Sequence, residues 1–270
     1  ASDITLARKT FGAGVPLIAK IEKPTALDDL EAIVREADGV MVARGDLGVE
    51  LSPEQVPIAQ RRIVRTARAH GKPVIVATHM LESMVEALVP TRAEANDVAT
   101  AVYQGADAVM LSAESAVGRH PTAAVAIMDR IIRAIETDRD ANPSSQAAPA
   151  PATVTTADAC ALAASKLADD LDCPMVVFTR SGSSAQRVSA TRPRQPIHAL
   201  TPQLSTARKL SLIWGVSADL ETEEPKSFDD ILDAVSRHEA ASGIKRFVIT
   251  AGYHYASDNS TDTIKDKERK

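Results

Sequence analysis

The chain has 270 residues, of which 44% are hydrophobic and 25% charged, and its formal net charge is −5. This length allows a buried core in one large or two smaller domains. The acidic balance argues against nucleic acid or an anionic membrane as the main partner. No apolar run approaches the roughly 20 residues of a membrane span. Cys160 and Cys173 lack metal-ligand spacing, so we expect reduced thiols in a cytoplasmic protein.

Short runs rich in β-branched residues alternate with helical patterns in the first half of the chain. We predict strands at residues 17–21, 39–43, 73–77 and 108–111. Helices are predicted between and after them, over about 27–34 and 58–67, from Thr91 onward, and over about 122–135. Thr91 and Glu94 have the spacing of a capping box. This alternation predicts a parallel α/β layer, for which the second half of a TIM-type (β/α)8 barrel is the natural candidate.

A Pro-, Ser- and Ala-rich stretch at 141–153 predicts a linker between two domains. The partial barrel then spans 1–140, and a separate α/β domain with a mainly parallel sheet spans 154–257. A polar tail, 258–270, is expected to be disordered. In the second domain we predict strands at 175–178, 197–200, 213–216 and 247–250, with helices over 157–171, from Ala185, and over 228–242.

Polar residues gather at the carboxyl end of each predicted barrel strand, where α/β barrels place their chemistry. They are Lys20 and Glu22, Arg44-Gly45-Asp46, Thr78-His79, and Ser112 with Glu114. Residues two apart in a strand point to the same side, so Lys20 and Glu22 should emerge together. A plain Lys–Glu salt bridge would explain that pair equally well.

Glu22 and Asp46 come from neighbouring strands and could converge on one Mg²⁺ or Mn²⁺ ion, which takes oxygen ligands. Lys20 beside them supplies a positive charge suited to a phosphoryl group. Gly45 permits close backbone approach, and the amides of this turn can receive a carboxylate or a phosphate. Thr78 presents a hydroxyl to the same opening, whereas His79 should point away from it.

The motifs of the first domain resemble those of pyruvate kinases in order and spacing. They are Lys20-Ile21-Glu22 and the segments 41–50, 71–74, 77–84, 90–94, 97–99 and 105–116. The resemblance covers most of 1–137 and, more loosely, 153–252. It implies phosphoryl transfer from phosphoenolpyruvate to ADP, giving pyruvate and ATP in glycolysis. It also implies Mg²⁺ or Mn²⁺, K⁺, and a homotetramer with 51–69 and 95–104 near subunit interfaces.

The same resemblance implies a role for each site residue. Lys20 would neutralise the transferring phosphoryl group, and Glu22 and Asp46 would hold the divalent metal. The backbone of Gly45 and Asp46 would receive the substrate carboxylate. Thr78 would lie beside the enolate and assist its protonation.

The sequence also departs from the family pattern. His79 stands where the family usually has glutamine. The family's phosphate-binding arginine, its K⁺ ligands and its lid domain have no counterpart, and the chain begins without an initiator methionine. We therefore expect a fragment or processed product, and no turnover by residues 1–270 alone.

In the second domain, Thr179, Ser181, Gly182, Ser183 and Ser184 form a hydroxyl-rich turn between a strand and a helix. Hydroxyls and free amides there make a phosphate cradle, with an ordinary helix N-cap as the alternative. In pyruvate kinases the corresponding turn often binds a sugar-phosphate or nucleotide effector. The charged tail after Gly252 replaces the family's glycine-rich loop.

Two other functions fit parts of the pattern. One is a metal-dependent aldolase or lyase that handles a pyruvate enolate, since such barrels also use Glu/Asp metal pairs. The other is a non-catalytic truncated paralogue that acts as an assembly or effector-binding module. A half barrel exposes unpaired strand edges, which would favour association with a partner.

Overall fold

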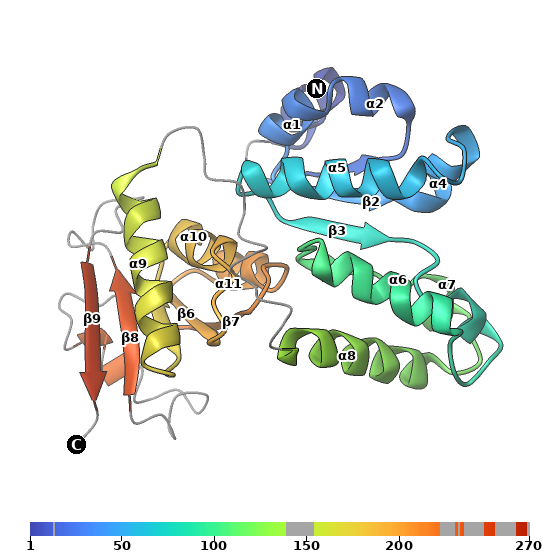
Figure 1. Cartoon of the computed structure of the whole chain (residues 1–270). Coiled ribbons are helices and arrows are strands. Elements are labelled where there is room, and N and C mark those ends of the chain that lie inside the picture. Colours follow the sequence, from blue (N-terminus) through green and yellow to red (C-terminus); the bar gives the residue numbers. More distant parts are fainter. Residues whose placement is uncertain are drawn as a thin grey trace. The chain divides into compact units, whose positions relative to one another are not determined.

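The computed structural model describes residues 1–12, 14–138, 154–221, 230–231, 233–234, 246–251 and 263–268. The chain forms two compact units, Ala1–Pro149 and Ala150–Lys270 (Figure 1). The predicted linker at 141–153 lies outside the described residues. Within the described part, none of the helices combines the length and the apolar character that crossing a membrane requires.

The first unit is built on a four-stranded parallel sheet in the order β1-β2-β3-β4. Its strands are β1 (Ile18–Ile21), β2 (Gly39–Ala43), β3 (Val74–Ala77) and β4 (Ala108–Val109). All four predicted strands are therefore confirmed. β2 has the predicted length, and the other three strands are one or two residues shorter than predicted. Because neighbours in sequence are neighbours in the sheet and all run parallel, every carboxyl end meets at the same edge, as in part of an α/β barrel.

Helices follow the strands as the apolar periodicity predicts. They are α1 (Ser2–Phe11), α2 (Pro24–Asp28), α3 (Leu30–Glu36), α4 (Arg44–Glu50), α5 (Val56–Ala69), η1 (Glu82–Val85), α6 (Arg92–Tyr103), α7 (Ala113–Ala116) and α8 (Pro121–Thr137). In Figure 1, α5 runs alongside β2 and β3, and α6 alongside α8. α5 buries Ile63, Val64 and Ala67 against the sheet residues Val42 and Val76 in one continuous core.

The predicted capping box at the start of α6 is confirmed. Thr91 Oγ1 accepts a hydrogen bond from Glu94 N at 3.2 Å, and Glu94 Oε2 accepts one from Thr91 N at 2.7 Å. Glu94 also accepts hydrogen bonds from the amide and hydroxyl of Ser83, both at 2.6 Å. The helix start and the turn after β3 are thereby held together.

The second unit contains a five-stranded sheet in the order β7-β6-β5-β8-β9. Its strands are β5 (Met175–Phe178), β6 (Ile197–Thr201), β7 (Val216–Leu220), β8 (Arg246–Ala251) and β9 (Thr263–Glu268). Its helices are α9 (Thr156–Asp170), α10 (Ser183–Ala190) and α11 (Leu204–Leu210). Every strand pair is parallel except β8 with β9. The mainly parallel α/β sheet predicted for this part is confirmed.

Two predictions for the second unit are wrong. A strand was expected at 213–216, but β7 begins only at Val216, because Gly215 takes a positive φ of 69° and turns the chain first. The tail was expected to be disordered, but its residues 263–268 form β9. The edge of β8 offers unpaired backbone groups, and Arg246 pairs with Asp266 across the two strands at 2.7 Å. Of the helix expected at 228–242, residues 230, 231, 233 and 234 are described and are helical.

Candidate active site at the strand ends of the first unit

Lys20 occupies the carboxyl end of β1 and points its ammonium group between two carboxylates. Lys20 Nζ lies 2.9 Å from Glu22 Oε2 and 2.7 Å from Asp46 Oδ2. Lys20 and Glu22 are two residues apart in extended chain and meet on one side. Asp46 comes from the first turn of α4, directly after β2. The structure thus brings together three of the residues predicted to form the site.

The charges of this trio are only half-buried. The side chains of Lys20, Glu22 and Asp46 are 51%, 38% and 52% exposed. Exposed ion pairs contribute little to stability, so packing alone does not explain why this sequence places three charges here. Hydrogen bonds to Asp46 and then to Glu22 raise the pKa of Lys20 well above its ordinary value. Lys20 therefore carries its full positive charge throughout the physiological pH range.

The two carboxylates fit a small divalent cation. Both approach a single nitrogen within 3 Å, so their oxygens already surround one position of positive charge. Among the described residues, no group of three or more His, Cys, Asp or Glu side chains could hold a metal. Mg²⁺, however, is commonly held by one or two carboxylates, with water and substrate oxygens completing its shell. Glu22 and Asp46 match that donor set.

Gly45 and Thr78 join the ends of β2 and β3. The Gly45 amide donates a hydrogen bond to Thr78 Oγ1 at 3.0 Å. A Cβ atom at position 45 would lie only 2.8 Å from Thr78 Oγ1 and 3.2 Å from His79 Cε1. Glycine is required here by close approach rather than by a positive φ. The Gly45 amide is thus hydrogen-bonded to Thr78. This contact places Thr78 next to the residue that precedes Asp46 in the sequence.

The expectation that His79 points away from the opening is wrong. His79 has a φ of 53°, which breaks the alternation of side chains that a continuing strand would impose. Its exposed imidazole ring turns back to lie against Gly45, beside the Thr78 hydroxyl.

Glu114, at the end of the fourth β/α unit, serves the fold rather than the opening. It is fully buried, and its carboxylate accepts hydrogen bonds from Leu81 N at 3.1 Å and Ser112 N at 2.7 Å. Both bonds tie the loop after β3 to the start of α7. The polar pattern at strand ends therefore combines ligand candidates with at least one structural carboxylate.

Arg44 and Asp97 were not singled out from the sequence as a pair. Arg44 NH1 lies 2.6 Å and 2.5 Å from the two carboxylate oxygens of Asp97. The residues are 53 positions apart, so no local spacing could reveal the pair. The sequence signals were an arginine directly beside Gly45 and Asp46 at a strand end and, separately, Asp97 within the motif at 97–99.

In the second unit, the predicted phosphate turn closes on itself. Thr179 Oγ1 accepts a hydrogen bond from Gly182 N at 3.0 Å, and Ser181 and Ser183 hydroxyls lie 3.2 Å apart. Gly182, with a φ of 89°, is the N-cap of α10 and provides no side-chain cap. The alternative of an ordinary helix N-cap therefore stays open, with Gly182 as the capping residue, while Ser183 and the buried Ser184 begin the helix.

Comparison with known proteins identifies both units. Residues 1–125 match the family model "Pyruvate kinase, barrel domain", and residues 158–265 match "Pyruvate kinase, alpha/beta domain". Proteins named pyruvate kinase are 49% identical in Agrobacterium vitis and 43% identical in Methylorubrum extorquens, over 98% and 97% of this chain and 56% of each relative. Pyruvate kinase 2 of Synechocystis is 44% identical over 94% of this chain and 43% of its own length. The chain thus spans about half the length of the relatives it matches, and it belongs to the pyruvate kinase family.

Proposed function

We propose that this chain provides the metal- and phosphoryl-binding part of a site that transfers a phosphoryl group from phosphoenolpyruvate to ADP, giving pyruvate and ATP. The observation that carries the proposal is the convergence of Lys20 with Glu22 and Asp46 at the carboxyl ends of β1 and β2. Phosphoryl transfer depends mainly on positioning and on stabilising developing charge, which an ammonium group beside a carboxylate pair can do.

Each residue has a proposed part in the reaction. Lys20 neutralises the phosphoryl oxygens, helped by a raised pKa that keeps it protonated. Glu22 and Asp46 hold Mg²⁺ or Mn²⁺, which when bound supplies charge stabilisation to the phosphoryl and enolate oxygens. The backbone of Gly45 and Asp46 receives the substrate carboxylate, and Thr78 assists protonation of the enolate. The Gly45 amide donates to Thr78 Oγ1 at 3.0 Å, so the substrate carboxylate would replace that hydroxyl as the acceptor of this amide.

Further partners follow from family membership. We propose a homo-oligomer, most simply a tetramer, with α5 and α6 near the interfaces; the exposed apolar side chains of Ile58 on α5 and Tyr103 on α6 support this. We also propose K⁺ as a cofactor and a cytoplasmic location. No residue of this chain is assigned to K⁺.

In the second unit, we propose the turn Thr179, Ser181, Gly182, Ser183 and Ser184 as the site of a phosphorylated effector. Support comes from the hydroxyl-bearing side chains gathered at the start of α10, whose N-cap is Gly182. Calorimetric titration with sugar phosphates and AMP tests this proposal. Heat of binding with at least one of them is expected, and silence from all of them would reduce the turn to a helix start.

The reaction is tested in a hybrid in which residues 1–270 replace the aligned segment of the Agrobacterium vitis relative, 49% identical to them. The hybrid should form pyruvate from phosphoenolpyruvate only when ADP and Mg²⁺ are both present. Cleavage of a carbon–carbon bond in place of phosphoryl transfer would favour the aldolase or lyase alternative. A folded hybrid without either activity would favour the non-catalytic module.

A further inference from the structure

The guanidinium group of Arg44 lies at the centre of a polar network behind the candidate site. Its side chain is only 11% exposed. On one side, NH1 donates to both carboxylate oxygens of Asp97 on α6 and approaches Gln60 Oε1 on α5 at 3.5 Å. Gln60 is buried and in turn donates to Gln104 Oε1 at 2.9 Å. Arg44 therefore connects the end of β2 to two helices.

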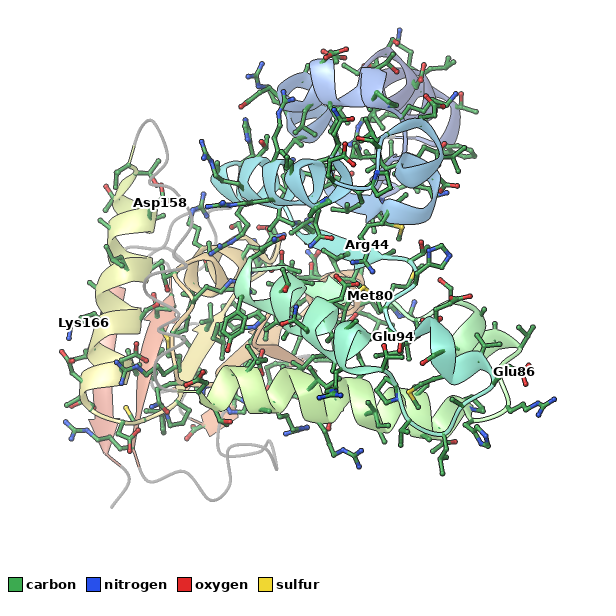
Figure 2. All side chains as sticks on the ribbon, turned by 45° about the vertical axis from the view of Figure 1, so that its right-hand side comes forward. Arg44, Met80, Glu86, Glu94, Asp158 and Lys166 are labelled. Carbon is green, nitrogen blue, oxygen red and sulfur yellow. The ribbon has the colours of Figure 1, made fainter. Side chains whose placement is uncertain are left out.

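On its other side, Arg44 binds the turn that follows β3. Arg44 NH2 donates to the carbonyl of Thr78 at 2.6 Å and approaches that of His79 at 3.3 Å, while Nε lies 3.2 Å from the Thr78 carbonyl. NH2 also lies 2.9 Å from Met80 Sδ, and Figure 2 shows Arg44 and Met80 side by side. Three consecutive residues of the turn thus contact one side chain.

The same turn is held from the opposite direction. Gly45, the neighbour of Arg44, donates its amide to the Thr78 hydroxyl at 3.0 Å. The side chain of residue 44 and the backbone of residue 45 therefore fix the carbonyl and the hydroxyl of one threonine together. His79, with its positive φ, is the residue that follows Thr78, and its carbonyl also contacts Arg44. A residue held in a sparsely populated backbone conformation persists only when its surroundings determine it.

Only arginine can make this set of contacts. Its planar group presents donors in a fixed fork, so it can face a carboxylate on one edge and carbonyls on the other. A lysine has one compact ammonium and cannot span both. Asp97, in turn, offsets the charge that Arg44 brings into a mostly buried position. The Arg44–Asp97 pair therefore orients the guanidinium group toward the turn after β3, which an exposed ion pair would not do.

We propose that Arg44, held by Asp97 and Gln60, is the positioning residue of the anion-binding turn formed by Gly45 and Thr78. This role rests on the proposed function of that turn. Arg44 does not touch the ligand itself. It fixes the Thr78 hydroxyl and the Gly45 amide in one arrangement and makes that arrangement depend on how α5 and α6 pack. Glu22 and Asp46 direct their carboxylates at Lys20, so metal binding by them should depend on Arg44 much less.

The test compares Arg44→Lys, Asp97→Asn and the double variant in the full chain. Arg133→Lys is the matched control, because Arg133 Nε contacts both carboxylate oxygens of Asp129 in an exposed pair on α8. Mn²⁺ affinity is measured first. Oxalate, a flat dianion that carries the carboxylate and adjacent oxygen of a pyruvate enolate, is then titrated into the Mn²⁺-loaded chain. Hydrogen exchange of peptides covering 77–81 reports on the turn without any ligand.

Each single variant should weaken oxalate binding by about tenfold or more, the loss expected for a charged hydrogen-bond network. Mn²⁺ affinity should stay within about threefold of the wild-type value. Hydrogen exchange at 77–81 should become faster in both single variants. The double variant should bind oxalate no more weakly than the weaker-binding single variant. Arg133→Lys should match the wild type in all three measurements. Asp97→Asn keeps the side-chain shape, so it remains informative if Arg44→Lys fails to fold.

Faster exchange with unchanged oxalate affinity would overturn the positioning role and leave a purely structural one. An equal loss of Mn²⁺ and oxalate affinity would also overturn it, because the effect would then not be confined to the turn. The wild-type chain decides the proposed function separately. If the wild-type chain binds no oxalate when loaded with Mn²⁺, the proposed function is wrong, and so is the ligand-positioning role of Arg44. Hydrogen exchange at 77–81 would still show whether Arg44 holds the turn in place.

Discussion

Lys20 Nζ lies 2.7 Å from Asp46 Oδ2, so the ammonium group of the proposed phosphoryl-binding lysine rests on a proposed metal ligand. The second proposed ligand, Glu22, contacts the same nitrogen at 2.9 Å. An ammonium group and a divalent cation would therefore compete for the same carboxylate oxygens. The two cations of the proposed mechanism are thermodynamically linked through Glu22 and Asp46.

This competition predicts that Lys20→Met tightens Mn²⁺ binding to the chain. Removing this exposed ion-pair partner frees both carboxylates for the metal, so the affinity should rise by up to about fivefold. Electron paramagnetic resonance of free Mn²⁺ measures the change. Lys23→Met, an exposed lysine three positions away, is the control and should leave the affinity unaltered. Weaker binding in Lys20→Met would argue against shared oxygens.

The same substitution should abolish phosphoryl transfer in the hybrid enzyme. Losing one preorganised charged donor costs about 10²- to 10³-fold in rate. Metal-dependent exchange of the methyl protons of pyruvate should continue, because it involves the enolate and not the phosphoryl group. Nuclear magnetic resonance of pyruvate in deuterated water follows that exchange. Loss of both reactions together would contradict the role given to Lys20.

Glu114 should prove essential for stability. Glu114→Ala leaves the amides of Leu81 and Ser112 without their carboxylate partner in a buried position. The free energy of unfolding should fall by about 2 to 4 kcal/mol. Urea unfolding followed by circular dichroism measures it. Glu86→Ala removes an exposed ion pair with Arg119 and should cost less than about 1 kcal/mol. Similar losses for the two variants would show that the Glu114 bonds are unimportant.

The stability contributed by Glu94 should depend on pH. Burial disfavours the ionised carboxylate, but hydrogen bonds from Ser83 and Thr91 outweigh it, so the pKa of Glu94 is lowered from 4.5. A lowered folded-state pKa means that the stabilisation is complete above the unfolded-state value and disappears as pH falls through the folded-state value. Glu94→Gln should therefore lower Tm at pH 7, and the difference should shrink below pH 4.5.

Thermal melts of both proteins between pH 7 and pH 3 test this dependence. Glu82→Gln is the control, since Glu82 is an exposed residue of η1, next to Ser83. It should change Tm little. A constant Tm difference for Glu94→Gln over the whole range would show that shape, and not charge, determines the effect of this residue.

The sequence predicted those features that depend on local spacing. The strand ends, the Thr91–Glu94 capping box and the common side of Lys20 and Glu22 all follow from periods of two or from a three-residue interval. Features that depend on tertiary contact could not be predicted in this way. Arg44 of α4 meets Asp97 of α6 across 53 positions of sequence. β9 forms by pairing with the edge of β8.

His79 illustrates a third case. Strand alternation correctly places Thr78 toward Gly45, but the rule stops holding one residue later, because the backbone leaves the strand region at His79. No pattern of apolar residues signals a positive φ at a histidine. Local rules therefore describe the chain correctly up to Thr78, and only the backbone conformation shows where the His79 ring lies.

Titration of the chain with Mn²⁺ tests the central claim most directly, because the claim is that Glu22 and Asp46 together hold a divalent cation. Glu22→Gln and Asp46→Asn keep the shape of each side chain and remove one ligand charge, and Asp28→Asn changes an exposed aspartate nearby as the control. The account predicts that each of the first two variants weakens Mn²⁺ binding by about tenfold or more, while Asp28→Asn binds as the wild type does. Equal Mn²⁺ affinity in all four proteins would contradict it.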